Sequence, residues 1–262
     1  MSNESYLESH KAKDYGAKYD HLYRPGSYER KIWCLESEII KNKIIKNKKI
    51  KKYLDFACGT GRLISVLESL AQESIGIDVS SSMLEQARKK LTKSTLIEIN
   101  VLEDDSMDEL FEECDLITAF RFFLNAEPKL QTQAIKKLSQ YLAQDGILIF
   151  NIHGNKYSSY YFYVLIHNLI KNAFYKLTNK RPKIFSFKKC LSITDIKKLI
   201  NDSNANLYIQ NIYTYGHIPR MISKFMPFSV WLAMERKLTM KWHVAGSHII
   251  IVCVPEKSLY RK

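Results

Sequence analysis

Two aspartates and two glycines stand where an α/β chain could bind a nucleoside. Asp55 ends an apolar run, and Gly59 and Gly61 follow it. Asp78 ends the next apolar run, 17 positions after Gly61. Glycines between a strand and a helix let the backbone approach a ligand, and an acid at the next strand tip can accept hydrogen bonds from ribose hydroxyls. The spacing therefore predicts a βαβ unit that binds a nucleoside.

The acid at the head of this turn argues against a pyrophosphate ligand. The phosphate-binding fingerprint reads Gly-x-Gly-x-x-Gly, whereas residues 55–61 read Asp-x-Ala-x-Gly-x-Gly. A carboxylate would repel a pyrophosphate at short range, but it would favour a ligand with a free ammonium group. S-adenosylmethionine has an ammonium, a ribose and an adenine, and it has no phosphate. At these residues the chain resembles the class I S-adenosylmethionine-dependent methyltransferases, although Ala57 stands where that family usually has glycine.

The resemblance implies S-adenosylmethionine as the cofactor and assigns several contacts to it. Asp78 is expected to bind both ribose hydroxyls. Asn100, where the family often has aspartate, can accept a hydrogen bond from the adenine amino group. Phe120, at the tip of the fourth strand, could pack against the sulfonium cation. The other expected cofactor contacts are Tyr19, Asp55, Ala57, Gly59, Gly61, Val79, Met83 and Val101.

Apolar runs that alternate with helix-compatible segments predict a parallel sheet with right-handed crossovers. Strands are predicted at residues 52–56, 74–79, 95–100, 115–120, 147–152, 206–213 and 247–254. Helices are predicted at residues 28–41, 61–70, 80–91, 130–142 and 192–203, and a turn at residues 144–146. The resemblance implies a Rossmann-like, seven-stranded, mostly parallel sheet. It also implies an antiparallel last strand, helices on both faces and helical lid inserts.

We predict one methyltransferase domain over residues 1–262. Its parts are an N-terminal helical cap (1–48), a cofactor-binding core (49–155), lid or substrate inserts (156–190 and 215–245), and the C-terminal part of the sheet (191–214 and 246–256). Both inserts are rich in aromatic and basic residues, and the first of them is predicted to be less regular than the core.

Three side chains near the predicted strand tips are candidates for catalysis. His153 follows the fifth strand and His217 lies in the second insert, so either imidazole could act as a general base. A structural role for each histidine stays open. Arg121 lies in an apolar run where a charge needs a partner. That partner could be an anionic substrate, the cofactor carboxylate or a local acid such as Glu127.

We expect a reaction without a metal ion, because no His, Asp and Glu cluster has metal-ligand spacing. The expected chemistry is in-line transfer of the methyl group to a substrate nucleophile, accelerated by positioning and by exclusion of water.

Five widely spaced cysteines, with no Cys-x-x-Cys pair, argue against a disulfide framework and a structural zinc site. No run of about 18 apolar residues is present, and the N-terminus lacks the apolar stretch of a secretory signal. A cytoplasmic location is the expectation.

The net charge of +13 leaves the partner open. A small molecule, including an anionic one, is the first candidate for the methyl acceptor, through O- or N-methylation of a secondary metabolite or glycan precursor. An RNA methyltransferase is the second candidate, because interleaved tyrosines and lysines suit RNA. The third is a catalytically inactive methyltransferase-like binding protein. The apolar run at residues 225–232 could form a buried lid helix or lie on a membrane surface.

Overall fold

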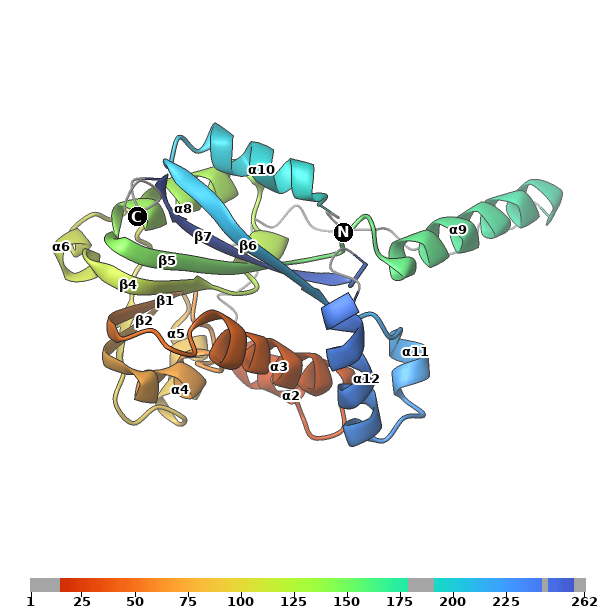
Figure 1. Ribbon diagram of the computed structural model, residues 1–262, viewed down its shortest axis with the longest axis horizontal. Coiled ribbons are helices and arrows are strands. Elements are labelled where there is room, and N and C mark those ends of the chain that lie inside the picture. The colour runs from red at the N-terminus through yellow and green to blue at the C-terminus, as the bar shows by residue number, and fades with distance from the viewer. Residues whose placement is uncertain (1–14, 179–190, 242–244, 257–262) are drawn as a thin grey trace.

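A seven-stranded sheet with helices on both faces organises the chain (Figure 1). The computed structural model describes residues 15–178, 191–241 and 245–256. The strands are β1 (Ile50–Phe56), β2 (Ala71–Asp78), β3 (Thr95–Glu98), β4 (Cys114–Ala119), β5 (Leu142–His153), β6 (Leu207–Tyr215) and β7 (His248–Pro255). Their order is β3-β2-β1-β4-β5-β7-β6, and all neighbours are parallel except that β7 runs antiparallel to both β5 and β6.

Helices connect and flank the strands. Before β1 lie α2 (Tyr15–His21), α3 (Tyr28–Ile39) and the π-helical turn η1 (Ile40–Ile44). Within the parallel half lie α4 (Ile64–Leu67), the 3₁₀ turn η2 (Glu68–Leu70), α5 (Ser81–Arg88), α6 (Asp108–Phe111), α7 (Phe122–Asn125) and α8 (Pro128–Gln140). After β5 lie α9 (Ser159–Thr178), α10 (Ile193–Asp202), α11 (Arg220–Ser223) and α12 (Phe228–Lys241).

Alternating side chains along β1 divide the core into two layers. Leu54 packs on one face of the sheet in a cluster that includes Leu138 of α8. Tyr53 packs on the other face in a cluster that includes Leu35 of α3. Successive residues of a strand point to opposite faces, so one strand supplies both layers. Strand β7, which lies between β5 and β6, is buried on both faces, which its unbroken apolar run 249–254 allows.

The predicted fold is confirmed, with two differences in detail. The turn predicted at residues 144–146 is an irregularity inside β5, because Leu142 pairs with Cys114 and Ile147 pairs with Leu116. The prediction that the first insert is less regular was wrong for residues 159–178, which form the 20-residue helix α9. Of its described apolar side chains only that of Val164 is buried, so they do not form the core-facing stripe by which a helix is recognised in a sequence.

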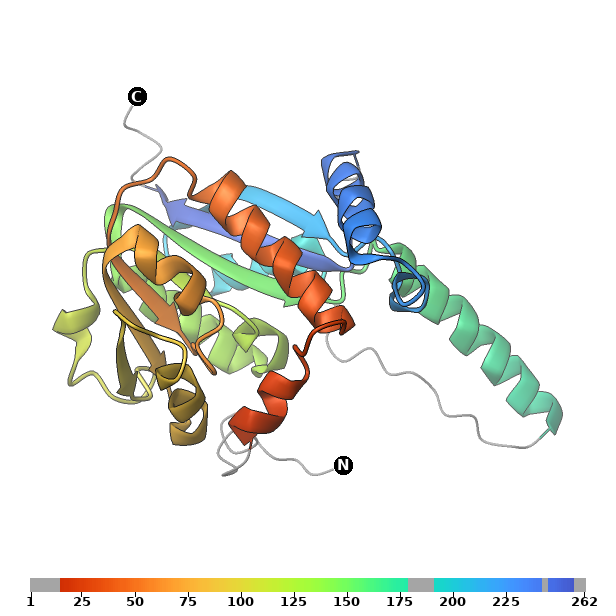
Figure 2. The same ribbon diagram turned by 90° about the horizontal axis from the view of Figure 1, so that it is seen from below.

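The predicted lid segments lie at one end of the molecule, where α9 projects from the body and α12 stands near α3 (Figure 2). The Nζ of Lys31 in α3 donates hydrogen bonds to the carbonyl oxygens of Ser223 (2.6 Å) and Met226 (3.0 Å). The N-terminal helices are therefore tied to the second insert. Residues 1–14 of the predicted cap, 179–190 of the first insert and 242–244 of the second lie outside the described residues, as does Cys190.

The turn after β1 depends on left-handed backbone conformations. Gly59 has φ +56° and Gly61 has φ +73°. A Cβ at Gly61 would lie 2.9 Å from the Cβ of Ala87, whereas a Cβ at Gly59 would meet nothing within 4 Å. Gly61 therefore permits close packing of the turn against α5, and Gly59 leaves space in front of the turn.

We expect Gly61→Ala to lower the free energy of unfolding by roughly 2–4 kcal/mol, since it combines an unfavourable left-handed φ with overpacking. Gly59→Ala is the matched control, because it has the same backbone conflict without the clash, and it should cost only roughly 1–2 kcal/mol. Urea denaturation of both variants measures the difference. Equal losses would contradict the packing role of Gly61.

Candidate functional site

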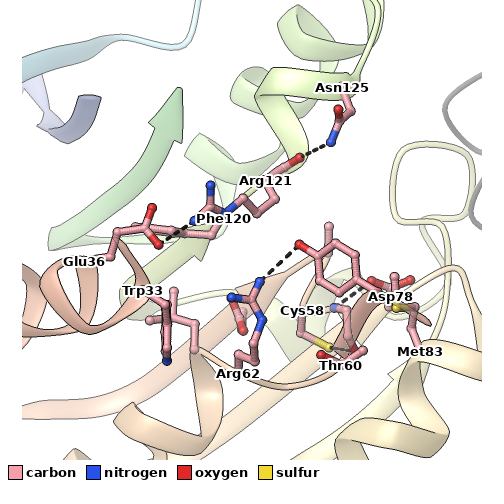
Figure 3. Close-up of a pocket in the computed structure, with 15 residues that line it drawn as sticks. Trp33, Glu36, Cys58, Thr60, Arg62, Asp78, Met83, Phe120, Arg121 and Asn125 are labelled. Carbon is pink, nitrogen blue, oxygen red and sulfur yellow. Dashed lines mark hydrogen bonds and ion pairs between the residues drawn. The ribbon is translucent and has the colours of Figure 1, made fainter. Parts of the chain in front are cut away.

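A pocket lies at the carboxyl ends of β1, β2 and β4, beneath α2 and α3 (Figure 3). Open parallel sheets bind ligands at this edge. The lining residues are Tyr19, Trp33, Glu36, Asp55, Ala57, Cys58, Gly59, Thr60, Arg62, Leu63, Asp78, Met83, Phe120, Arg121 and Asn125. The lining thus combines two carboxylates and two arginines from the core with residues of the two N-terminal helices.

Asp55 presents a buried carboxylate that is half satisfied. Its side chain lies at the end of β1, and the residue is only 2% exposed. Oδ1 accepts a hydrogen bond of 2.6 Å from the hydroxyl of Thr118, while Oδ2 is buried without a partner among the described residues. Burial raises the pKa of Asp55 to about 7, and the Thr118 hydrogen bond opposes part of that shift. A cationic ligand would pair with the Asp55 carboxylate and offset the cost of burying its charge.

Asp78, at the end of β2, is held by the backbone. Oδ2 accepts a hydrogen bond from the Gly59 N–H at 2.8 Å, and Oδ1 accepts one from the Ser80 N–H at 2.9 Å. Because β1 and β2 are adjacent and parallel, Asp55 and Asp78 end at the same edge of the sheet. The second carboxylate is therefore fixed beside the open space in front of Gly59.

Arg62 lines the pocket and carries a charge opposite to that of Asp55. It was not among the site residues predicted from the sequence. Its guanidinium lies over the ring of Tyr23, with Cζ 3.4 Å from the ring centroid, and Nη2 donates to the hydroxyl of Tyr19 at 3.1 Å. Nη1 is buried without a hydrogen-bond partner among the described residues. The position of Arg62 directly after the glycine turn could have identified it as a site residue. The pocket thus holds one unsatisfied anionic oxygen and one unsatisfied cationic nitrogen.

Helix α2 is held over the glycine turn by Asp20. The Thr60 hydroxyl donates to Asp20 Oδ1 at 2.5 Å, and the Lys90 Nζ pairs with Oδ2 at 2.5 Å. Lys90 also donates to the carbonyl oxygen of Thr60 at 2.8 Å. These contacts hold Tyr19 over the pocket.

Arg121 pairs with Glu36 of α3 rather than with the predicted local acid Glu127. Nη2 of Arg121 lies 2.6 Å from Glu36 Oε2. Oε1 of Glu36 accepts hydrogen bonds from the Asn151 amide (3.0 Å) and from the Tyr215 hydroxyl. Arg121 itself has φ +68°, and its N–H donates to Asn151 Oδ1 at 2.7 Å. Glu36 is 0% exposed, so this network is a buried, charged link between α3 and the tips of three strands.

The residues predicted for the site are placed in three ways. Eight of them line the pocket: Tyr19, Asp55, Ala57, Gly59, Asp78, Met83, Phe120 and Arg121. Five described residues are not among the lining residues: Gly61, Val79, Asn100, Val101 and His217. The backbone of His153 ends β5, and its side chain lies outside the described part of the structure.

His217 and Asn100 make contacts of their own. Nδ1 of His217 lies 3.2 Å from Oε2 of the buried Glu235, which also accepts from the His217 N–H. Asn100 Oδ1 accepts from the Leu102 N–H at 3.3 Å. In the described residues, no three His, Cys, Asp or Glu side chains form a group that could hold a metal ion.

Comparison with known proteins agrees with this geometry. Residues 54–146, which span β1 to the start of β5, match the family model described as a methyltransferase domain. Residues 54–146 thus form a methyltransferase domain, and the strand order is the one that the resemblance to class I S-adenosylmethionine-dependent methyltransferases implies. S-adenosylmethionine is the cofactor of such a domain, as predicted.

A protein of Geobacillus sp. (strain WCH70) that is named a putative methyltransferase is 30% identical to this chain over 107 residues. The match covers 40% of this chain and 43% of that protein. The chain spans less than half the length of the curated relatives it matches.

Two solved structures share the fold across nearly the whole chain. An S-adenosylmethionine-dependent methyltransferase from Thermotoga maritima has a TM-score of 0.58 at 15% identity and covers 92% of this chain and 96% of its own. Another S-adenosylmethionine-dependent methyltransferase, from Archaeoglobus fulgidus, has a TM-score of 0.57 at 13% identity and covers 92% of this chain and 99% of its own.

The polar groups of the methyltransferase domain fit the cofactor. S-adenosylmethionine has an amino acid end with one ammonium and one carboxylate, and the pocket has one buried oxygen of Asp55 and one buried nitrogen of Arg62 without partners. The open space at Gly59 allows backbone approach. Buried polar groups cost free energy until they are paired, so a zwitterionic ligand complements the pocket.

Cofactor binding by the methyltransferase domain should strengthen as the pH rises through about 7. Asp55 is protonated below its raised pKa of about 7, and a neutral carboxyl attracts an ammonium less than a carboxylate does. Titration calorimetry with S-adenosylmethionine should show affinity falling by up to about tenfold per pH unit below that pKa. Asp55→Asn should bind weakly and lose this dependence. An unchanged slope in the variant would assign the titration to another group.

Glu36→Gln should lower the free energy of unfolding by about 3 kcal/mol, because it leaves the partly buried Arg121 without its charged partner. The double variant Glu36→Gln/Arg121→Met should be more stable than the sum of the two single losses predicts. Arg236→Met, which removes an exposed ion pair with Glu38, is the control and should cost less than about 1 kcal/mol. Urea denaturation measures these three variants and the single variant Arg121→Met, and additive losses would contradict the coupling.

Proposed function

We propose that this protein transfers the methyl group of S-adenosylmethionine to a nucleophilic atom of a small molecule, without a metal ion. The observation that carries the proposal is the pocket at the tips of β1, β2 and β4, beneath α2 and α3. Within the described residues it holds one carboxylate oxygen, of Asp55, and one guanidinium nitrogen, of Arg62, that make no hydrogen bond. When bound, S-adenosylmethionine supplies a methyl group activated by its sulfonium.

In this proposal the cofactor is held by residues of the glycine turn and the strand tips. Asp55 accepts hydrogen bonds from the ammonium, and Arg62 donates hydrogen bonds to the carboxylate. Asp78 accepts from the ribose hydroxyls, as the resemblance implies. Phe120 supplies an aromatic face for the sulfonium. Asn100 and Val101, in the turn after β3, contact the adenine end of the cofactor in this proposal.

The cover over the pocket favours a small acceptor. Tyr19 of α2 and Trp33 of α3 line the pocket together with Glu36, and Asp20 holds α2 to Thr60 and Lys90. Helices that cover part of a site limit the access of water and restrict a bulky polynucleotide. Positioning within such an enclosure can supply most of the acceleration.

The polar residues at the acceptor side have different proposed roles. We assign Arg121 a positioning role, because Glu36 already balances its charge and its backbone shapes the tip of β4. We propose His153 as the general base, because β5 ends beside the tip of β4. His217 is bound to Glu235 and is not among the lining residues, so we propose that it stabilises the second insert.

The test is a screen of lysate metabolites with purified protein and methyl-labelled S-adenosylmethionine. The lysate is separated by size, and each fraction is assayed with and without RNase treatment. We expect label in the low-mass fraction, unaffected by RNase. Asp55→Asn should lose this transfer, and Leu70→Asp, a substitution at an exposed site on the opposite edge of the sheet, should retain it.

Two results would overturn the proposal. Label that appears in the high-mass fraction and disappears with RNase would mean that RNA is the acceptor. Calorimetric binding of S-adenosylmethionine without transfer to any fraction would mean that the chain is a binding protein.

A further inference from the structure

Helix α9 carries an apolar face that nothing in the described structure covers. Of its described side chains (residues 159–173), only that of Val164 is buried. Phe162, Ile166, Leu169 and Ile170 are 54–67% exposed. Their spacing of four, seven and eight residues from Phe162 places them on one side of the helix.

The more polar side of α9 is the more buried one. Asn168 and Lys171 fall on the same side of the helix as the buried Val164, and both are partly buried. A surface helix of a soluble domain has the opposite arrangement, with its apolar stripe against the core. The orientation of α9 therefore leaves its apolar side for a partner.

A second apolar surface lies on α11 and the start of α12, at the same end of the molecule as α9 (Figures 1 and 2). Phe225 is 90% exposed, Met221 is 68% exposed and Ile222 is 55% exposed. Lys31 binds the carbonyl oxygens on either side of Lys224 and Phe225, at Ser223 and Met226, so this tip is held in place by α3.

The sequence segments that carry both surfaces are rich in basic residues. No acidic residue occurs between Asp145 and Asp195, a stretch that contains α9 and eight lysines and arginines. Between Asp202 and Glu256 the only acid is Glu235, which is 0% exposed. Two acids approach these surfaces from other elements, and each is paired with a base: Glu29 with Arg220 and Asp195 with Lys156. Large exposed apolar areas with an excess of basic residues fit the interface of an anionic lipid layer.

We propose that α9 and the α11–α12 tip dock the protein on an anionic membrane surface, with the apolar side chains inserted at the headgroup boundary and the lysines at the lipid phosphates. No described helix is long and apolar enough to cross a bilayer. The surface therefore lies on the membrane and does not span it. This inference does not depend on the methyl acceptor.

The test is co-sedimentation of the full chain with two kinds of vesicle, phosphatidylcholine alone and phosphatidylcholine mixed with phosphatidylglycerol. We expect binding to the mixed vesicles that weakens with added salt. Ile166→Asp/Ile170→Asp should weaken this binding at least about tenfold, since it puts two carboxylates on the apolar face. Leu70→Asp/Tyr208→Asp is the matched control, because it adds the same charge at exposed sites away from α9 and should bind as the unaltered protein does.

Thermal unfolding and calorimetry with S-adenosylmethionine show that both double variants are folded, and neither measurement should change. Three results would overturn the proposal. The chain could fail to bind the mixed vesicles, or the control could lose binding as much as the α9 variant. Light scattering could instead show a dimer that the α9 variant dissociates without any vesicle binding, in which case the surface is a contact between two copies.

Discussion

The buried carboxylate of Glu36 links the N-terminal helices to the strands that build the site. Burying a charge is costly unless charged and polar partners surround it. Glu36 meets that requirement with the guanidinium of Arg121, the amide of Asn151 and the hydroxyl of Tyr215, which come from the tips of β4, β5 and β6. Packing of α3 on the sheet and the hydrogen bonds at the three strand tips therefore depend on each other. The cover of the pocket is an integral part of the sheet edge.

The carboxylate of Asp55 is also buried, but it differs from that of Glu36 in its hydrogen bonds. Glu36 is fully paired within the chain, whereas Asp55 keeps one buried oxygen without a partner in the described structure. Arg62 keeps one nitrogen in the same condition, although aromatic rings surround its guanidinium. Buried polar atoms that line a pocket and make no hydrogen bond in the protein can be satisfied by a ligand. Beside the structural ion pair of Glu36 and Arg121, the pocket thus contains a second carboxylate and a second guanidinium, which we propose bind the cofactor.

Much of the sheet could be predicted from the sequence, because each strand is a short apolar run and the glycine turn has a fixed place after β1. The acids at the ends of β1 and β2 followed from the same pattern. The partner of Arg121 could not be predicted, since Glu36 lies 85 residues away and nothing local relates them. The helical state of α9 was missed for a different reason. Its apolar residues do not face the core, and periodicity indicates a helix most clearly when a core-facing stripe is present.

The position of β7 has a consequence for biosynthesis. β6 pairs within the described sheet only with β7, and β7 is also the strand that joins β6 to β5. During translation β6 leaves the ribosome before its neighbour has been made, and α11 and α12 follow it before β7 appears. Long-range pairing of this kind is slow and leaves strand edges open on the nascent chain. The parallel strands of the sheet can pair early. Until β7 has been made, β6 has unpaired backbone groups, which a chaperone could recognise.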